Sequence, residues 1–188
     1  NQVQQHVHRQ VLGYVHGLKQ RFRRRTDHLS ALAELRSLWE RDFVSTSLEI
    51  EAQIEEESRH PSTSWQDIEA VLLDVLDEID VRMINGKATD ALDYADSATG
   101  LKVIAIGGDK LARGLTLEGL CTSYFLRASK MYDTLMQMGR WFGYRPGYLD
   151  LCRLYTTNDL VEWFEHIADA AEELRAEFDF MMESRLTP

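Results

Sequence analysis

The residues best suited to chemistry follow an apolar, strand-like segment at residues 103–106. This segment runs into a polar turn that contains Gly107, Gly108, Asp109, Arg113 and Gly114. In an open parallel sheet, ligands bind beyond the carboxyl ends of the strands. Adjacent glycines let the backbone approach a ligand, and their successive N–H groups can bind an anion. The spacing therefore fits a ligand-binding turn, and it fits equally a plain strand-to-helix turn in which Arg113 makes an ordinary ion pair.

A second group of candidate residues ends a predicted helix over residues 130–140. Its methionines are expected to pack in the core, because a methionine stripe at helical spacing is more often core than a cofactor contact. Arg140 and Arg145 lie where glycines interrupt regular structure. A guanidinium group binds phosphate through two parallel hydrogen bonds, a geometry that lysine does not reproduce. We therefore expect both arginines to face a phosphate ligand.

Four strand-like segments must position these residues, at 81–85, 102–106, 121–126 and 151–155. Helical segments alternate with them, which predicts an α/β fold with a parallel sheet flanked by helices. Residues 1–79 have helical periodicity throughout, so they either cover one face of the sheet or form an inserted helical portion. The expected organisation is a helical portion at 1–79 and a sheet-containing lobe at 80–188.

Local signals predict where the helices begin and which faces they bury. The first helix has an apolar stripe of Val3, Val7, Val11, Leu12, Val15, Leu18 and Phe22. Asp27 is the predicted N-cap of a second helix, and a third helix is expected to begin near Ser47. Ser64 and Asp67 form a loose capping-box pattern ahead of a fourth helix. A final amphipathic helix is expected to carry Trp163, Phe164, Ile167, Leu174, Phe178 and Met181.

Together the two groups resemble the second RecA-like lobe of superfamily-two helicases. Asp109, Arg113 and Gly114 match an Asp-x-x-x-Arg-Gly element, and Gly139 with Arg140 match part of a later Gln-x-x-Gly-Arg-x-x-Arg element. The match departs from that pattern at three positions. Gln137 lies two residues before the glycine instead of three, Arg145 follows Arg140 by five positions instead of three, and Thr116 replaces a frequent aspartate.

The sequence of residues 104–120 and 137–145 is similar to the Z-one domain of proteins described as endonucleases. That family is similar to helicases and is linked to DNA restriction or modification. The resemblance implies a RecA-like P-loop NTPase lobe that acts on ATP with Mg²⁺ held mainly by another lobe. It implies that Arg140, or Arg145, serves as an arginine finger. It also implies nucleotide contacts from Gly107, Gly108, Asp109, Arg113, Gly114 and Gln137, and it implies DNA as a partner.

The sequence contains no Gly-x-x-x-x-Gly-Lys-Ser/Thr, so the chain by itself is not expected to cradle ATP phosphates or to hydrolyse ATP. It begins at Asn1 and enters helical periodicity at once, which suggests a piece of a longer protein. The expected partner within that protein is an N-terminal ATP-binding lobe.

Charge and composition limit the function classes. The formal charge of −10 argues against a protein that coats DNA phosphates over its whole surface. Residues 1–26 nevertheless carry six basic residues and no acid, and the arginine cluster at 21–25 could touch a phosphate backbone or form a solvated helix end. No apolar run approaches the length needed to cross a bilayer. Cys121 and Cys152 are expected to be buried thiols, which together with the lack of a leader suggests a cytoplasmic protein.

Two alternatives from other classes remain open. A nuclease with its own Mg²⁺ site needs clustered carboxylates and a lysine, but the sequence has no Asp/Glu-x-Lys tripeptide, and Glu55, Glu56 and Glu57 have the character of a solvated helix face. We therefore expect no metal site within the chain. A non-catalytic module that binds nucleotide or nucleic acid would also explain two phosphate-binding arginines, because a fold does not dictate an activity.

Overall fold

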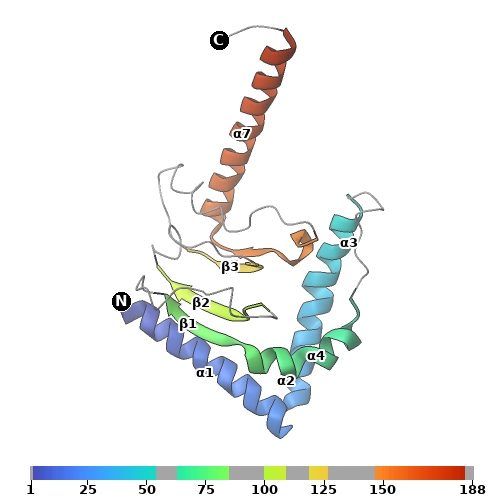
Figure 1. Ribbon diagram of the computed structural model, residues 1–188, viewed down its shortest axis with the longest axis vertical. Helices are drawn as coiled ribbons and strands as arrows, with labels where there is room; N and C mark the ends of the chain where they lie inside the picture. The colour runs from blue at the N-terminus through green and yellow to red at the C-terminus, as the bar shows by residue number, and fades with distance from the viewer. Residues whose placement is uncertain (1, 54–62, 85–99, 109–118, 127–146, 185–188) are drawn as a thin grey trace. The chain divides into compact units, whose positions relative to one another are not determined.

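The computed structural model describes residues 2–53, 63–84, 100–108, 119–126 and 147–184 (Figure 1). Its contacts divide the chain into two compact units. The first unit comprises residues 1–116 and 146–151, and the second comprises residues 117–145 and 152–188. The organisation into 1–79 and 80–188 stays a prediction, although the strand segments at 80–84 and 103–107 belong to the same compact unit as the N-terminal helices.

The first unit is built mainly from helices. Its elements are α1 (Gln2–Arg24), α2 (His28–Leu38), η1 (Trp39–Val44), α3 (Ser45–Glu51), α4 (Trp65–Glu78), β1 (Asp80–Ile84), β2 (Val103–Gly107) and the short η5 (Leu149–Leu151). The buried apolar side chains among its described residues are Val15, Ala31, Trp65, Leu76, Val81 and Ile84. They come from α1, α2, α4 and β1, so the core lies where these helices meet the first strand.

The strands β1 and β2 pair in parallel, as the sequence predicts. Their register runs from Asp80 opposite Val103 to Ile84 opposite Gly107, so the two strands end together at one edge. Figure 1 shows α1 running alongside both strands, and α1 contacts each of them. A parallel pair thus has helical cover, as parallel strands require when one face would otherwise meet water.

The N-terminal half of α1 does not bury the stripe that its valines suggest. Val3 is 69% exposed and Val7 is 39% exposed, whereas Gln4 and His8 are half-buried. His8 donates from Nε2 to the carbonyl oxygen of Val81 in β1, at 3.1 Å. A strand edge offers carbonyl groups that need donors, so polar side chains replace valine on the buried side of this part of the helix.

The predicted break between the second and third helices is absent, because α2, η1 and α3 follow one another without an interruption in helical backbone. Within the π-helical stretch η1, the rings of Trp39 and Phe43 stack with centroids 5.5 Å apart. At its end Ser45 donates to the carbonyl of Arg41 at 2.9 Å. Hydrogen bonds from a side chain to carbonyl groups of the preceding turn compete with the regular backbone hydrogen bonds of an α-helix. This competition is compatible with a π-helical turn here.

The two predicted N-caps have different outcomes. Asp27 occupies the N-cap position of α2, as predicted, but its backbone is left-handed with φ of 51° and its side chain makes no capping hydrogen bond. Its carboxylate instead accepts a hydrogen bond from the guanidinium group of Arg21 at 2.7 Å and forms an ion pair with it. The capping box of Ser64 and Asp67 is confirmed, with Ser64 Oγ accepting from the Asp67 backbone N–H. Hydrogen bonds from the Ser64 side chain and backbone to the carboxylate lower the pKa of Asp67 below its usual value.

The second unit contains β3 (Thr122–Tyr124), β4 (Arg153–Tyr155) and the long helix α7 (Asn158–Ser184). β3 and β4 are parallel, with Ser123 opposite Leu154. The final helix is confirmed, and Leu160 near its start is 1% exposed. The cysteines that flank these strands, Cys121 and Cys152, are thiols outside any disulfide and are half-buried, not fully buried as expected.

The fold is therefore a mixture of helices and small parallel sheets. The sequence predicts one parallel sheet, whereas the described residues form two separate two-stranded sheets. The predicted helix at 130–140 lies outside the described residues. In the part of the chain that is described, no helix is both long enough and apolar enough to cross a membrane.

Candidate functional site

The candidate site begins at the carboxyl end of β2, where Gly107 and Gly108 leave the sheet. Gly107 is half-buried and lies opposite Ile84, the last residue of β1. Gly108 is the first residue beyond the strand and is exposed. The two glycines thus lie where the sequence places them, at the edge at which open parallel sheets bind ligands.

Gly108 has a neighbour that the sequence reasoning missed. A Cβ atom at this position would come within 2.7 Å of the side-chain nitrogen of Gln4. Glycine therefore makes room for an amide group from α1, which is a structural reason for this residue besides any contact with a ligand. The spacing of Gln4 and His8, one helical turn apart, was the available signal that this face of α1 approaches the strands.

The remaining residues of the candidate site lie outside the described residues. They are Asp109, Arg113, Gly114, Gln137, Arg140 and Arg145. Their roles stay predictions, and the chemistry of the set still fits a triphosphate, because three guanidinium groups and a glycine turn supply donors suited to phosphate oxygens.

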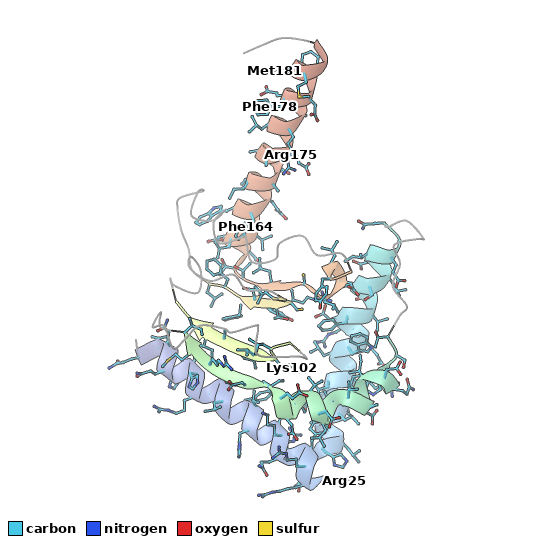
Figure 2. The ribbon with its side chains drawn as sticks, in the orientation of Figure 1. Arg25, Lys102, Phe164, Arg175, Phe178 and Met181 are labelled. Carbon is cyan, nitrogen blue, oxygen red and sulfur yellow. The ribbon has the colours of Figure 1, made fainter. Side chains whose placement is uncertain are left out.

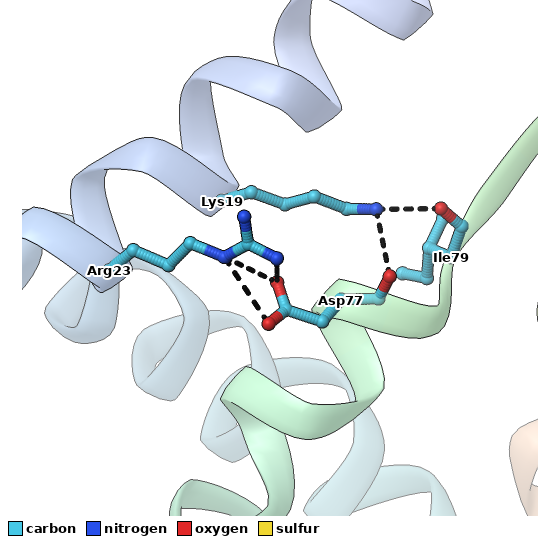
Figure 3. Close-up of polar contacts among 4 residues, drawn as sticks. All are labelled: Lys19, Arg23, Asp77 and Ile79. Atoms are coloured by element: carbon cyan, nitrogen blue, oxygen red, sulfur yellow. Dashed lines mark hydrogen bonds and ion pairs between the residues drawn. The ribbon is translucent and has the colours of Figure 1, made fainter.

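The basic end of α1 is largely used within the first unit (Figure 3). Lys19 donates to the carbonyl oxygens of Ile79 at 2.8 Å and of Asp77 at 3.2 Å, which are the last turn and cap of α4. Arg23 forms an ion pair with the Asp77 carboxylate at 2.9 Å. Lys19 satisfies carbonyl groups that a helix end leaves without partners, and both cations complement the negative dipole of that end.

Within the arginine cluster at 21–25, the ion pairs separate two kinds of residue. Arg21 and Arg23 are paired with Asp27 and Asp77. Arg24 and Arg25 are exposed and take part in none of the ion pairs of the described residues, and Arg25 has a left-handed backbone with φ of 53°. Figure 2 labels Arg25 at this end of α1. Ion pairs within the first unit thus account for Arg21 and Arg23, and both alternatives, a solvated helix end and contact with phosphate, stay open for the other two.

Metal ligation has no support in the described part of the chain, where no group of three or more histidine, cysteine or acidic side chains could hold an ion. His8 could have been read as half of a His-x-His pair with His6, but its ring nitrogen is engaged by Val81.

The comparisons with known proteins give one positive result. The family model described as the Z1 domain matches residues 1–188. No curated protein and no solved structure matches the chain.

Proposed function

The chain belongs to the Z1 domain family, and from that premise we propose that it is the second motor lobe of an ATP-dependent, DNA-acting protein, helicase-like and described as an endonuclease. In this proposal the lobe has a RecA-like fold and supplies arginine fingers to ATP that another lobe binds with Mg²⁺. The protein that contains both lobes would be a hydrolase of DNA restriction or modification.

The observation that carries the proposal is the shared edge of β1 and β2. Their parallel register ends both strands at Ile84 and Gly107, and the glycine turn follows at once. The Asp-x-x-x-Arg-Gly element from Asp109 to Gly114 continues directly from this edge in the sequence. A parallel edge followed by a glycine turn and a guanidinium group is the arrangement in which an α/β lobe presents residues to a nucleotide.

Each residue then has a defined task. The backbone N–H groups of Gly107 and Gly108, at the carboxyl end of β2, would donate toward an anion. Arg113, together with Asp109, couples the cleft to the bound DNA strand. Arg140 and Arg145 place guanidinium groups on the charge that develops on the γ-phosphoryl oxygens. ATP with Mg²⁺ supplies that phosphoryl group, and an arginine finger accelerates such a transfer by about 10³–10⁵-fold.

The proposal is tested by Arg140→Ala in the longer protein that contains both lobes. We expect nucleotide binding to change little, because the other lobe makes most of those contacts, and hydrolysis to fall by about 10³-fold or more. Arg140→Lys should not restore it, because lysine cannot form the bidentate contact. Arg9→Ala is the matched control, since Arg9 is exposed on α1 and lies outside both the arginine cluster at 21–25 and the candidate site.

Two outcomes would contradict the assignment. Unchanged ATP hydrolysis in Arg140→Ala would show that Arg140 is not an arginine finger. Metal-dependent nicking of plasmid DNA by the 188-residue chain alone would instead place a nuclease centre within it.

A further inference from the structure

The helix α7 carries an apolar seam that is only partly buried. Apolar side chains recur along α7 at alternating spacings of four and three residues, at Leu160, Phe164, Ile167, Ala171, Leu174, Phe178 and Met181. Three heptads with apolar a and d positions are the pattern of a helix that packs lengthwise against another helix. Figure 2 labels Phe164, Phe178 and Met181 along this helix.

The seam is buried at its first residue, and Leu174 and Phe178 in its C-terminal half are exposed. Leu160 is 1% exposed, whereas Leu174 is 53% and Phe178 is 56% exposed. Phe180 and Met182 are 65% and 78% exposed. A helical segment of this length gains most of its stability from tertiary packing of an apolar face, not from intrinsic propensity. Leu174 and Phe178, one turn apart on the same face of α7, therefore form an exposed apolar surface suited to contact with another molecule.

The charge of α7 indicates the kind of molecule. Its 27 residues include nine acidic side chains and one arginine, Arg175. None of the ion pairs among the described residues involves α7. Asp169, Glu173 and Glu177 follow one another at intervals of four, and like charges at this spacing destabilise a helix. Cations from outside the helix would remove that repulsion.

Acidic and apolar groups meet at one place on this surface. A shallow depression is lined by Ala170, Glu173, Leu174, Ala176, Glu177 and Phe180. Small alanines let a partner backbone approach, Leu174 and Phe180 supply apolar contact, and the carboxylates of Glu173 and Glu177 are positioned for lysine or arginine. A second copy of α7 would bring the same excess of acids to the interface, which disfavours self-association.

We propose that the C-terminal half of α7, residues 170–182, is a docking surface for a basic amphipathic helix of a protein partner. The partner packs apolar residues against Leu174 and Phe178 and places lysine or arginine beside Glu173 and Glu177. This proposal does not depend on the proposed function.

The test uses the full chain and a synthetic helical peptide of about three heptads, with leucine at its a and d positions and lysine at the flanking positions. We expect saturable binding that weakens as salt rises, measured by fluorescence anisotropy of the labelled peptide. Leu174→Asp should weaken binding by about tenfold or more, because it places a charge in the apolar contact. Leu29→Asp is the matched control, since Leu29 is 68% exposed on α2.

A second pair of variants keeps the test meaningful if Leu174→Asp disturbs the helix. Glu173→Gln with Glu177→Gln preserves side-chain size, and we expect several-fold weaker binding with a shallower salt dependence. Glu162→Gln with Glu165→Gln, nearer the start of α7, should leave binding unchanged. The same peptide with glutamate in place of lysine should not bind.

Three results would overturn the proposal. One is equal binding of the lysine and glutamate peptides, and another is binding that the substitutions at Glu173, Leu174 and Glu177 leave unchanged. The third is a dimer of the chain in sedimentation that Leu174→Asp abolishes, because it would assign the surface to a second copy.

Discussion

At the carboxyl end of β2, Gly108 gives space to the amide of Gln4. The close contact is with the far end of a flexible side chain, so it can be relieved by rotation at a small energetic cost. A glycine at a strand end can thus serve packing and still leave its backbone N–H available to a ligand.

Replacement of this glycine gives a first prediction. Gly108→Ala should destabilise the chain by only about 0.5–1 kcal/mol, because Gln4 can move away from the new methyl group. Urea unfolding measures the change. In a background of Gln4→Ala the cost of Gly108→Ala should disappear, and a full cost in that background would show that another neighbour sets the limit.

Lys19 acts on the end of another helix through two carbonyl oxygens, those of Asp77 and Ile79. Lys19→Met keeps the aliphatic stem and removes the ammonium, so we expect a loss of about 0.5–1 kcal/mol in the free energy of unfolding. Arg24→Met, which alters an exposed cation with no ion pair among the described residues, is the control and should change stability by less than about 0.5 kcal/mol. Equal effects of the two substitutions would contradict a specific role for Lys19.

At the scale of the element, α4 is delimited by features from both near and far in the sequence. Its start is a local capping box, whereas its end is held by Lys19 and Arg23 from α1. The start is therefore fixed by neighbouring residues, whereas the end is stabilised by contacts from α1.

The capping box gives a prediction about pH. Ser64→Ala should cost about 1 kcal/mol, a usual value for loss of an N-cap. Asp67→Asn should also destabilise α4, and its effect should depend on pH. The folded-state pKa of Asp67 is lowered, so the stabilisation by its carboxylate is present above the usual value of 3.8 and is lost as the pH falls through the folded-state pKa.

The measurement is the difference in unfolding free energy between the wild-type chain and Asp67→Asn as a function of pH. We expect a constant difference from neutral pH to about pH 5 and a decline below about pH 4. A difference that grew on acidification would contradict the hydrogen-bonded carboxylate.

At the scale of the whole molecule, β1 and β2 depend on the N-terminal helices. His8 bonds to Val81, and Lys102 forms an ion pair with Glu78 at the end of α4. The core of the first unit joins Val15 and Leu76 of the helices to Val81 and Ile84 of β1. A two-stranded sheet is at best marginally stable in water without such cover.

A truncated chain tests this dependence. Residues 80–188 without residues 1–79 should lose ordered β1 and β2, because Val81 and Ile84 would be exposed to water, each at a cost of about 1.5–3 kcal/mol. Amide hydrogen exchange compares the strands in the truncated and full chains. Protection of β1 and β2 in the truncated chain equal to that in the full chain would instead support residues 80–188 as an autonomous lobe.

The sequence by itself determined what local interactions decide. The four strand segments, the capping box at Ser64 and the final helix follow from periodicity and from hydrogen bonds over three or four residues, so each could be predicted. The glycines at 107 and 108 were also placed correctly, because a strand that ends in two glycines is a local pattern. The arginines that carry the proposed chemistry were identified from sequence alone, and their positions stay predictions.

Only the tertiary structure decided which polar groups are drawn into contacts between distant segments. Gln4 and His8 replaced Val3 and Val7 on the buried side of α1 because the strands present carbonyl groups and a glycine surface there. Asp27 pairs with Arg21 instead of making the expected capping hydrogen bond, and Lys19 donates to the carbonyl of Ile79, which is 60 residues away in the sequence. These contacts depend on which donors and acceptors the fold brings together. The pattern of residues along the sequence does not show which distant groups will be close in space.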